Sequence, residues 1–415
     1  MRRIQIAKLH PGVVLRHSLY DDKYTLLLAP GKQLTHEMVL SLRNTGHEYA
    51  YLGTEGADGK NVMELRAEAE KLSDEILAEF DKLLTKEDLE PKPQGPSMLD
   101  QILSQLKVNR DAKSIDELMT VCENADNFVE DIAQGWIHED EVGQAALATA
   151  NSFASALMHD PSMVSLLAQA KRSDTYLFKH SVNVSLLGMQ VTAALGYGRE
   201  QVVQAGVASL LQDLGMAMVP KDIAGKQEKL GPIEMIDIHK HTSHSMYLIE
   251  RFKGVQLIPR FVAMQCHERA DGSGYPRRRP KRLIHVFARI VSVVDIYDSL
   301  ISERPWRAAH HPYDALEILI RGASRGLYDA DAVRGLLQVL SLYPIGTYVR
   351  LNTGEVGRVV HPNGSQFGRP VVCVTLDNHG KAVRGPIHHD LSKKTELSVT
   401  EIMRQAPEQG VFAGF

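Results

Sequence analysis

The sequence is poor in cysteine, has no long apolar run and carries no strong excess of either charge. It contains three cysteines, an odd and scattered set that does not predict a disulfide framework. No stretch approaches the roughly 20 apolar residues of a membrane-spanning helix, and the opening Met-Arg-Arg-Ile-Gln-Ile lacks the apolar core of a signal peptide. A formal net charge of -4 gives no general attraction to nucleic acid or membranes. We therefore expect a cytoplasmic protein that binds neither.

The 415 residues are too many for one ordinary domain, and changes of pattern divide them. Pro91 to Pro96 holds three prolines in six residues, which predicts a linker rather than a helix. The predicted parts are a small β-rich domain (1–57), a helix and proline-rich linker (58–97), a helical domain (98–342), a small β-barrel-like domain (343–395) and a tail (396–415). The predicted fold class is mainly α, a helical bundle flanked by small β-rich N-terminal and SH3-like C-terminal segments.

Strand-like runs between turn signals occupy both ends of the chain. They predict strands at 12–15, 24–28, 48–52, 348–351, 356–360 and 371–376. Thr35 is the expected N-cap of a short helix from His36 to Arg43. The C-terminal runs are typical of a small SH3-like barrel, which the N-terminal strands could complete.

Helical periodicity fills the middle of the chain. It predicts helices at 59–85, 98–106, 115–122, 128–132, 142–158, 180–195, 312–321 and 330–341. Four further amphipathic runs are expected. One leads up to Asp213, one begins at Pro232, one ends at Cys266, and one precedes Asp295. The 59–85 helix is expected to lie on the surface of its own domain or to pair with a partner helix.

The stretch from His267 to Pro276, His-Glu-Arg-Ala-Asp-Gly-Ser-Gly-Tyr-Pro, closes one of these helical runs and enters a loop. Gly272 and Gly274 permit backbone torsions and a close approach that a Cβ would prevent, while Pro276 stiffens the exit. Taken alone, the loop is either a tight turn or a ligand-binding segment.

Potential metal ligands recur on or beside the predicted helices. In chain order they are His180, Asp213, His241, His267 and Asp295. Asp295 follows an apolar stripe, where a carboxylate is costly to bury unless it is paired or bound to a metal. Such side chains can converge inside a helical bundle, although each histidine alone could equally be a satisfied core residue.

Motifs in the second half of this region carry a resemblance to a known family. After the Gly-Tyr-Pro loop come Ala288-Arg289-Ile290, Val294-Asp295-Ile296-Tyr297-Asp298 and Arg304-Pro305-Trp306-Arg307. With these motifs, residues 170 to 325 resemble the HD-GYP family, bacterial phosphodiesterases of the HD superfamily that cleave cyclic di-GMP. The resemblance implies an HD-type helical bundle around a metal centre.

The chain departs from the family's ligand series, which runs His, His-Asp, His, His-His, Asp. Gln212 stands for the histidine of the His-Asp pair, and Cys266 for the first of the paired histidines. Met216 replaces a lysine that contacts substrate phosphate in the family, and Tyr176 stands where members with a third metal carry glutamate. The resemblance therefore implies a degenerate member.

These departures bear on the metal centre, because two-metal hydrolysis needs several hard ligands for each ion. The resemblance gives a first position of His180, Asp213 and Asp295, and a second of Asp213, His241, His267 and, as a thiolate, Cys266. Gln212 offers only a neutral carbonyl oxygen, and Cys266 could instead be a small buried hydrophobe. We expect one divalent cation (Fe, Mn or Zn) or none, with Asp213 as the catalytic residue if the protein is active.

Cationic side chains near the motifs offer candidate ligand contacts. Arg304 and Arg307 match phosphate-contacting residues of the family, and Tyr275 or Trp306 could stack on guanine. The run from Arg277 to Arg282 has five cations in six positions. Three interpretations of this run are open: a solvated surface, additional phosphate binding, or a docking site for another protein. In the family that the chain resembles, the Gly-Tyr-Pro loop is implicated in contact with GGDEF domains.

Two functional hypotheses remain open at this point. The favoured one is a non-hydrolytic cyclic di-GMP sensor or protein-interaction module that could engage GGDEF-domain or other signalling proteins. The alternative is an active metal-dependent phosphodiesterase that yields pGpG or GMP. A homodimer is compatible with both.

Overall fold

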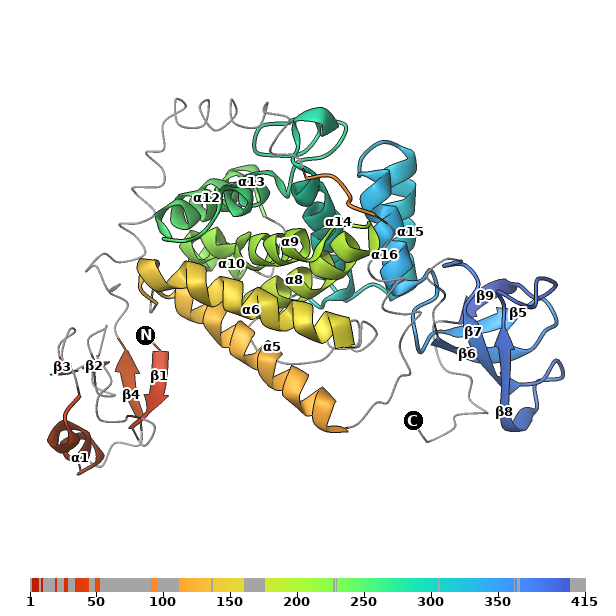
Figure 1. Ribbon diagram of the computed structural model, residues 1–415, viewed down its shortest axis with the longest axis horizontal. Helices are drawn as coiled ribbons and strands as arrows, with labels where there is room; N and C mark the ends of the chain where they lie inside the picture. The colour runs from red at the N-terminus through yellow and green to blue at the C-terminus, as the bar shows by residue number, and fades with distance from the viewer. Residues whose placement is uncertain are drawn as a thin grey trace.

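The computed structural model describes residues 2–6, 9, 19–20, 26–28, 34–44, 49–52, 91–95, 112–135, 137–159, 176–226, 228, 230–304, 307–361, 363 and 366–403. These residues form a helical bundle, a small N-terminal sheet and a C-terminal sheet (Figure 1). The predicted mainly α fold class is confirmed.

One helix, α8 (Tyr176–Ala194), runs through the middle of the bundle. From Phe178 onward almost all of its side chains are buried, including polar ones such as Ser185 and Thr192. Helices that pack against α8 are α5 (Ala112–Ala133), α6 (Glu139–His159), α9 (Arg199–Leu211), α14 (Val286–Ile301) and α16 (Ala330–Leu340). Because α8 is surrounded, residues on several of its faces can reach neighbouring helices.

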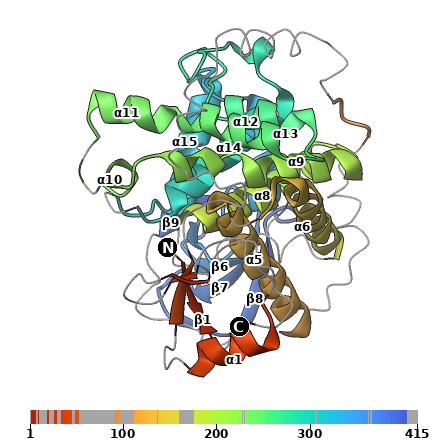
Figure 2. The same cartoon turned by 90° about the vertical axis from the view of Figure 1, so that its left-hand side faces the viewer.

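A second group of helices lies beside α9. Helix α13 (Leu257–Gln265) packs on α9, and α12 (His241–Arg251) packs on α13 and on η3 (Leu214–Met218). Helix α15 (Pro312–Ser324) packs on α14 and α16. The short helices α10 (Lys221–Ala224) and α11 (Pro232–His239) lie at the outer edge (Figure 2), and α11 buries none of its own residues. A final turn, η4 (Lys281–Leu283), follows the Gly-Tyr-Pro loop.

Gly215 allows two of these segments to meet closely. A Cβ at this position would lie 2.1 Å from the carbonyl oxygen of His241 and 2.5 Å from the backbone nitrogen of Ser245. The Gly215 N–H also donates to the Ser245 hydroxyl at 2.8 Å. This contact brings the end of α9 against the start of α12, and Asp213 and His241 lie at these two ends.

The N-terminal sheet is antiparallel, with strand order β1-β4-β2-β3. Its strands are β1 (Arg2–Gln5), β2 (Leu19–Tyr20), β3 (Leu26–Leu28) and β4 (Tyr49–Leu52), and α1 (His36–Asn44) contributes to the same small core. Thr35 accepts a hydrogen bond from the Met38 backbone at 3.2 Å, as an N-cap does.

The C-terminal sheet has five antiparallel strands in the order β8-β7-β6-β5-β9. They are β5 (Tyr348–Leu351), β6 (Val356–His361), β7 (Val371–Leu376), β8 (Ala382–Asp390) and β9 (Val399–Met403). The described N-terminal strands belong to a separate sheet, so they do not complete this one as the sequence had suggested. Because β9 pairs with β5, the sheet extends beyond residue 395.

Most predicted elements appear with shifted ends. The runs at 115–122 and 128–132 form one helix, α5, and the run that begins at Pro232 forms two, α11 and α12. Strands β1, β2, β8 and β9 were not predicted. The predicted elements at 12–15, 59–85 and 98–106 lie outside the described residues. Within the described part of the chain, no helix is both long and apolar enough to cross a membrane.

Candidate metal centre

Five side chains from separate parts of the bundle converge on one buried place. They are His180 in α8, Asp213 after α9, His241 at the start of α12, His267 after α13 and Asp295 in α14. They form two groups that share Asp213: Asp213, His241 and His267 in one, and His180, Asp213 and Asp295 in the other. Within each group the donor atoms lie within 4.8 Å of one another.

Asp213 lies between the histidines. Its Oδ1 is 3.4 Å from Nε2 of His241 and 3.6 Å from Nε2 of His267, and its Oδ2 is 3.7 Å from Nε2 of His180. Oδ1 is buried and has no hydrogen-bond partner among the described residues. Burial alone would raise the pKa of Asp213, but His241 and His267 hold it well below its usual range. An ionised buried oxygen that faces two imidazoles fits a divalent cation.

The two imidazoles of this group also face each other. Nε2 of His241 lies 2.9 Å from Nε2 of His267. Two ring nitrogens at this distance share either a proton or a cation, because two unprotonated nitrogens repel each other. Nδ1 of His241 donates to the Ile238 carbonyl at 2.6 Å, which leaves Nε2 as the atom available for a metal.

His180 in the other group is held between two carboxylates. Its Nε2 is 2.9 Å from Oδ1 of Asp295, and its Nδ1 is 2.7 Å from Oδ2 of Asp298. Burial disfavours the imidazolium, but the hydrogen bonds to Asp295 and Asp298 outweigh it and raise the pKa of His180 to about 10. A cation at this group competes with that proton, because a coordinating nitrogen must be unprotonated.

Asp298 and Asn183 are supporting residues that sequence reasoning missed. Asn183 donates to Oδ1 of Asp298 at 2.9 Å, while Oδ2 of Asp298 fixes the ring of His180. Each stands three residues after a predicted ligand, Asn183 after His180 and Asp298 after Asp295, and therefore on the same helical face. That spacing was the signal that could have identified them.

The Gly-Tyr-Pro loop is tied to the site through its own backbone. The buried carboxylate of Glu268 accepts from the N–H groups of Arg277 at 2.7 Å and Arg279 at 2.9 Å, a role that the sequence did not reveal. A Cβ on Gly274 would meet backbone atoms of His267, Glu268 and Arg269 at 2.4 to 2.6 Å. The loop therefore folds tightly over the residues that follow His267.

The ring of Tyr275 in the loop stacks with two imidazoles. Its centroid is 3.7 Å from that of His239 and 5.0 Å from that of His267. That Tyr275 stacks on guanine stays a prediction; its ring is already stacked with two imidazoles. Trp306, the other predicted stacking residue, lies outside the described residues.

Arg304 and Arg307 follow α14 and fold back onto Ser299, which lies one helical turn beyond Asp295. Arg304 donates to the Ser299 hydroxyl at 3.1 Å, and Arg307 donates to the Ser299 carbonyl at 2.5 Å. Their backbones bond each other at 2.9 and 3.0 Å, which fixes their separation. In the basic run, Arg277, Arg278, Lys281 and Arg282 are exposed.

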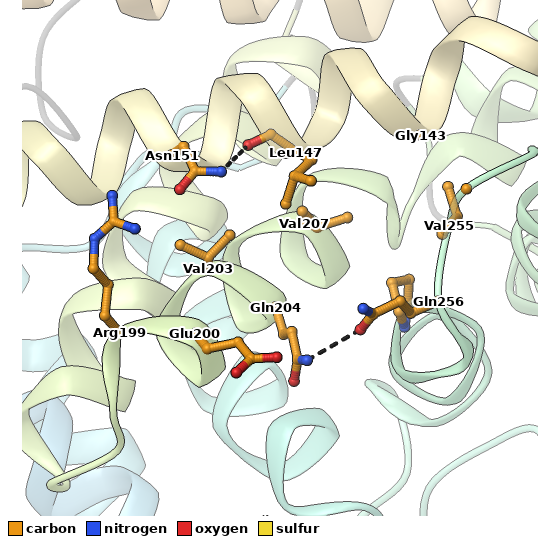
Figure 3. Close-up of a pocket in the computed structure, with 12 residues that line it drawn as sticks. Gly143, Leu147, Asn151, Arg199, Glu200, Val203, Gln204, Val207, Val255 and Gln256 are labelled. Carbon is orange, nitrogen blue, oxygen red and sulfur yellow. Dashed lines mark hydrogen bonds between the residues drawn. The ribbon is translucent and has the colours of Figure 1, made fainter.

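A cavity of about 530 Å³ lies apart from the ligands, between α6, α9 and the turn before α13 (Figure 3). Leu147, Val203 and Val207 line it, and Gln204 and Gln256 share a 3.0 Å hydrogen bond beside it. It contains none of the predicted site residues, so it gives no support to any of them.

Comparison with known proteins agrees with this arrangement. Residues 163–332 match the HD domain family, and residues 348–408 match the KOW domain associated with HD domain. The chain carries an HD-GYP domain. The C-terminal sheet lies within the KOW match, where the sequence had suggested an SH3-like module.

Several relatives of the HD-GYP domain have named activities. The cyclic di-GMP phosphodiesterase PA4108 of Pseudomonas aeruginosa is 32% identical over 229 residues, 55% of this chain and 54% of that protein. The 3'3'-cGAMP-specific phosphodiesterase 1 of Vibrio cholerae is 28% identical over 156 residues, 38% of this chain and 36% of that protein. The chain thus spans about half or less of these relatives. The solved structure of Bd1817, an HD-GYP-type protein of Bdellovibrio bacteriovorus, aligns with 82% of this chain and 99% of its own. The two share 16% sequence identity at a TM-score of 0.48, a similarity that supports no conclusion about the site.

Gln212 is the main departure of this HD-GYP domain. Its side chain is fully buried beside Asp213, and neither its amide oxygen nor its amide nitrogen has a hydrogen-bond partner among the described residues. An unpaired buried amide costs about 1–3 kcal/mol, so a ligand or water that engaged it would be favoured. Its oxygen is a neutral and weaker donor than the imidazole for which it stands.

Cys266 does not join either ligand group. Its Sγ donates to the Ala263 carbonyl at 3.7 Å, within its own helix. Burial, together with the carboxylates of Asp213 and Asp295, raises the pKa of its thiol well above the usual value. Since only the thiolate is a good metal ligand, this geometry favours the alternative in which Cys266 is a small buried hydrophobe.

Proposed function

We propose that this chain is a cyclic di-GMP signalling protein whose HD-GYP domain binds the dinucleotide without hydrolysing it. The observation that carries the proposal is the buried, unpaired amide of Gln212 beside Asp213, where hydrolysis by two metals would need another imidazole. One group of donors, Asp213, His241 and His267, is complete enough for a single cation. The other has His180 engaged by Asp295 and Asp298.

The donor types support one divalent cation at Asp213, His241 and His267. Two imidazoles and a carboxylate suit iron, manganese or zinc. When bound, such an ion polarises a phosphoryl oxygen and lowers the pKa of a coordinated water. The protein's own contribution is to orient the donors: Asp298 fixes His180, and the Ile238 carbonyl fixes His241.

Two arginines support recognition of the dinucleotide's phosphates. Arg304 and Arg307 are held at the end of α14 through Ser299, near the metal ligand Asp295 on the same helix. Guanidinium groups form paired hydrogen bonds with phosphate oxygens. Met216 brings no cation to the site, so these arginines carry more of the phosphate binding. Similarity to PA4108 favours cyclic di-GMP, and the Vibrio relative makes 3'3'-cGAMP the first competitor to test.

The proposal is tested by metal analysis, binding and turnover on one preparation. We expect about one ion per chain, cyclic di-GMP binding by calorimetry, and no linear product when the protein is incubated with Mn or Fe(II). Asp213→Ala and His241→Ala are the matched controls for background hydrolysis. Formation of pGpG or GMP above these controls would overturn the proposal.

An active phosphodiesterase is the second candidate. It is favoured by the convergence of four predicted donors, from His180, His241, His267 and Asp295, around Asp213 and by the named activity of PA4108. In that case Asp213 would orient the attacking water. A cytoplasmic location, contact with GGDEF-domain proteins through the Gly-Tyr-Pro loop, and a homodimer remain predictions under either candidate.

A further inference from the structure

Three aromatic rings form a stack that ends on a candidate metal ligand. Tyr275 is stacked with both His239 and His267, with interplanar angles of 12° and 10°. The same tyrosine meets the edge of His241 at 6.2 Å and 81°. Tyr275 therefore touches both imidazoles of the Asp213 group, one by its face and one at an angle.

His267 differs from the other two histidines in how its ring is held. Metal-binding histidines usually donate their second ring N–H to a carboxylate or carbonyl, which fixes the ring. Nδ1 of His180 has Oδ2 of Asp298 at 2.7 Å, and Nδ1 of His241 has the Ile238 carbonyl at 2.6 Å. Nδ1 of His267 is 3.8 Å from Oδ2 of Asp295, too far for a hydrogen bond.

We propose that Tyr275, backed by His239, is a positioning residue that fixes the ring plane of His267 by stacking, in place of that hydrogen bond. The proposal rests on the proposed metal site at Asp213, His241 and His267. It assigns the tyrosine of the Gly-Tyr-Pro loop to the metal ligand rather than to a nucleotide base.

The backbone places Tyr275 for this role. Its N–H donates to the His267 carbonyl at 3.2 Å, so the loop returns directly over the ligand. Gly274, just before it, is in contact with the backbone at His267 and leaves no room for a side chain. The ring of Tyr275 is thus set against His267 by the loop itself.

His239 brings the outer helix α11 into the site. This helix buries none of its residues, and Ile233 and Ile236 are 78% and 58% exposed. Lys226 anchors it by an ion pair with Glu234 at 2.7 Å, and the His239 ring anchors its other end on Tyr275. We infer that α11 supports His267 through this ring, in addition to fixing His241 through the Ile238 carbonyl.

The test is Co(II) affinity and the visible absorption spectrum of the Co(II) protein, measured on the full chain. Tyr275→Leu should bind Co(II) about 10-fold more weakly, the loss typical of outer-shell partners, with a changed ligand-field band. Tyr275→Phe keeps the ring and should match the wild type. His239→Ala should lose about threefold, and His239→Phe should recover it. Ile233→Ala, on the same helix, is the control and should change nothing.

Several results would overturn the inference. Wild-type affinity and spectrum in Tyr275→Leu would show that the ring does not position His267. An equal loss in Tyr275→Phe would assign the effect to the hydroxyl group. If Tyr275→Leu fails to fold, the His239→Ala and His239→Phe pair decides, since His239 lies on an outer helix. A wild-type chain that binds no Co(II) refutes the metal site and this inference together, whereas binding with unaltered variants refutes only the stack.

Discussion

At the scale of single residues, Asp213 is the side chain on which the site depends, because both groups of donors include it. The predicted donors were found in the sequence because each stands on or beside a predicted amphipathic run. Their supporting residues were harder to find. Asp298 acts on a histidine 118 positions earlier in the chain, so its i+3 spacing from Asp295 marks a shared helical face but not this partner. His239 acts on a tyrosine across a loop, and only the folded chain reveals that contact.

Replacement of Gln212 tests how many ions the site can hold. Gln212→His should raise the metal content from about one to about two ions per chain, because an imidazole is a stronger donor than a neutral amide. Gln212→Leu, of similar size but without donor atoms, should keep about one ion if the amide is not a required ligand. Elemental analysis of the purified proteins measures both. Two ions in the wild type would contradict the idea that Gln212 limits occupancy.

Removal of Arg304 and Arg307 tests phosphate recognition. The double alanine variant should bind cyclic di-GMP at least about 100-fold more weakly, since hydrogen bonds to charged groups contribute about 1.5–3 kcal/mol each. The exposed pair Arg278 and Arg282 provides the control, and their double alanine variant should bind nearly as the wild type does. Calorimetry measures the affinities. If the two double alanine variants bind cyclic di-GMP equally well, Arg304 and Arg307 are not part of the nucleotide site.

At the scale of elements, periodicity located the helices but not their breaks. The run after Pro232 splits at Lys240, where neither glycine nor proline marks the end, so the sequence offered no signal. Because α11 ends there, the Ile238 carbonyl is available to accept a hydrogen bond from Nδ1 of His241. In contrast, α5 is one continuous helix where the sequence predicted two. The polar residues Glu123, Asn124 and Asn127 interrupt the apolar pattern, but they lie on the exposed face of this helix.

Gly215 shows how one packing contact sets the site. Gly215→Ala would place a Cβ 2.1 Å from the His241 carbonyl, so η3 and α12 must separate. We expect metal affinity to fall by at least about 10-fold, because ligands displaced from their positions bind poorly. Gly368→Ala is the control, since no atom lies within 4 Å of the added Cβ. Co(II) titration of both variants checks this. Wild-type affinity in Gly215→Ala would show that η3 and α12 can accommodate the added Cβ without displacing the ligands.

Asp329 joins two elements and predicts a pH effect. It caps α16 through the Asp331 and Ala332 N–H groups, and it pairs with Lys281 and Arg289, both at 3.1 Å. Burial opposes its charge, but these contacts lower its pKa below the usual 3.8. A lowered folded-state pKa means that the stabilisation is complete above pH 3.8 and is lost as the pH falls through the lower folded value.

Asp329→Asn can still cap the helix but loses the charge, so its stability should vary less below pH 4 than that of the wild type. Asp329→Ala also loses the cap and should cost about 1–2 kcal/mol at neutral pH. Asp331→Asn, at an exposed neighbouring position, serves as the control. Urea unfolding between pH 3 and 7 measures all of them, and an unchanged acid profile in Asp329→Asn would contradict the assignment.

At the scale of the whole molecule, the bundle and the C-terminal sheet have separate cores that meet at a short junction. The carbonyl of Phe367 accepts from the Ser341 hydroxyl at 2.8 Å and from the Leu342 N–H at 3.0 Å, and its ring packs against the bundle core. The sequence predicted the strands on either side but not this contact, because the loop that holds Phe367 has no periodic pattern.

This junction predicts how the two parts unfold. Phe367→Ala removes a half-buried ring from the bundle core and should cost about 1–2 kcal/mol, less than the 3–5 kcal/mol of a fully buried phenylalanine. If the junction couples the parts, calorimetry should resolve two transitions in the variant where the wild type gives one. Leu147→Ala, an exposed site on α6, provides the control. Metal content should be unchanged, because the ligands all lie within the bundle. Two transitions already present in the wild type would mean that the parts unfold independently and that the Phe367 contact does not couple them.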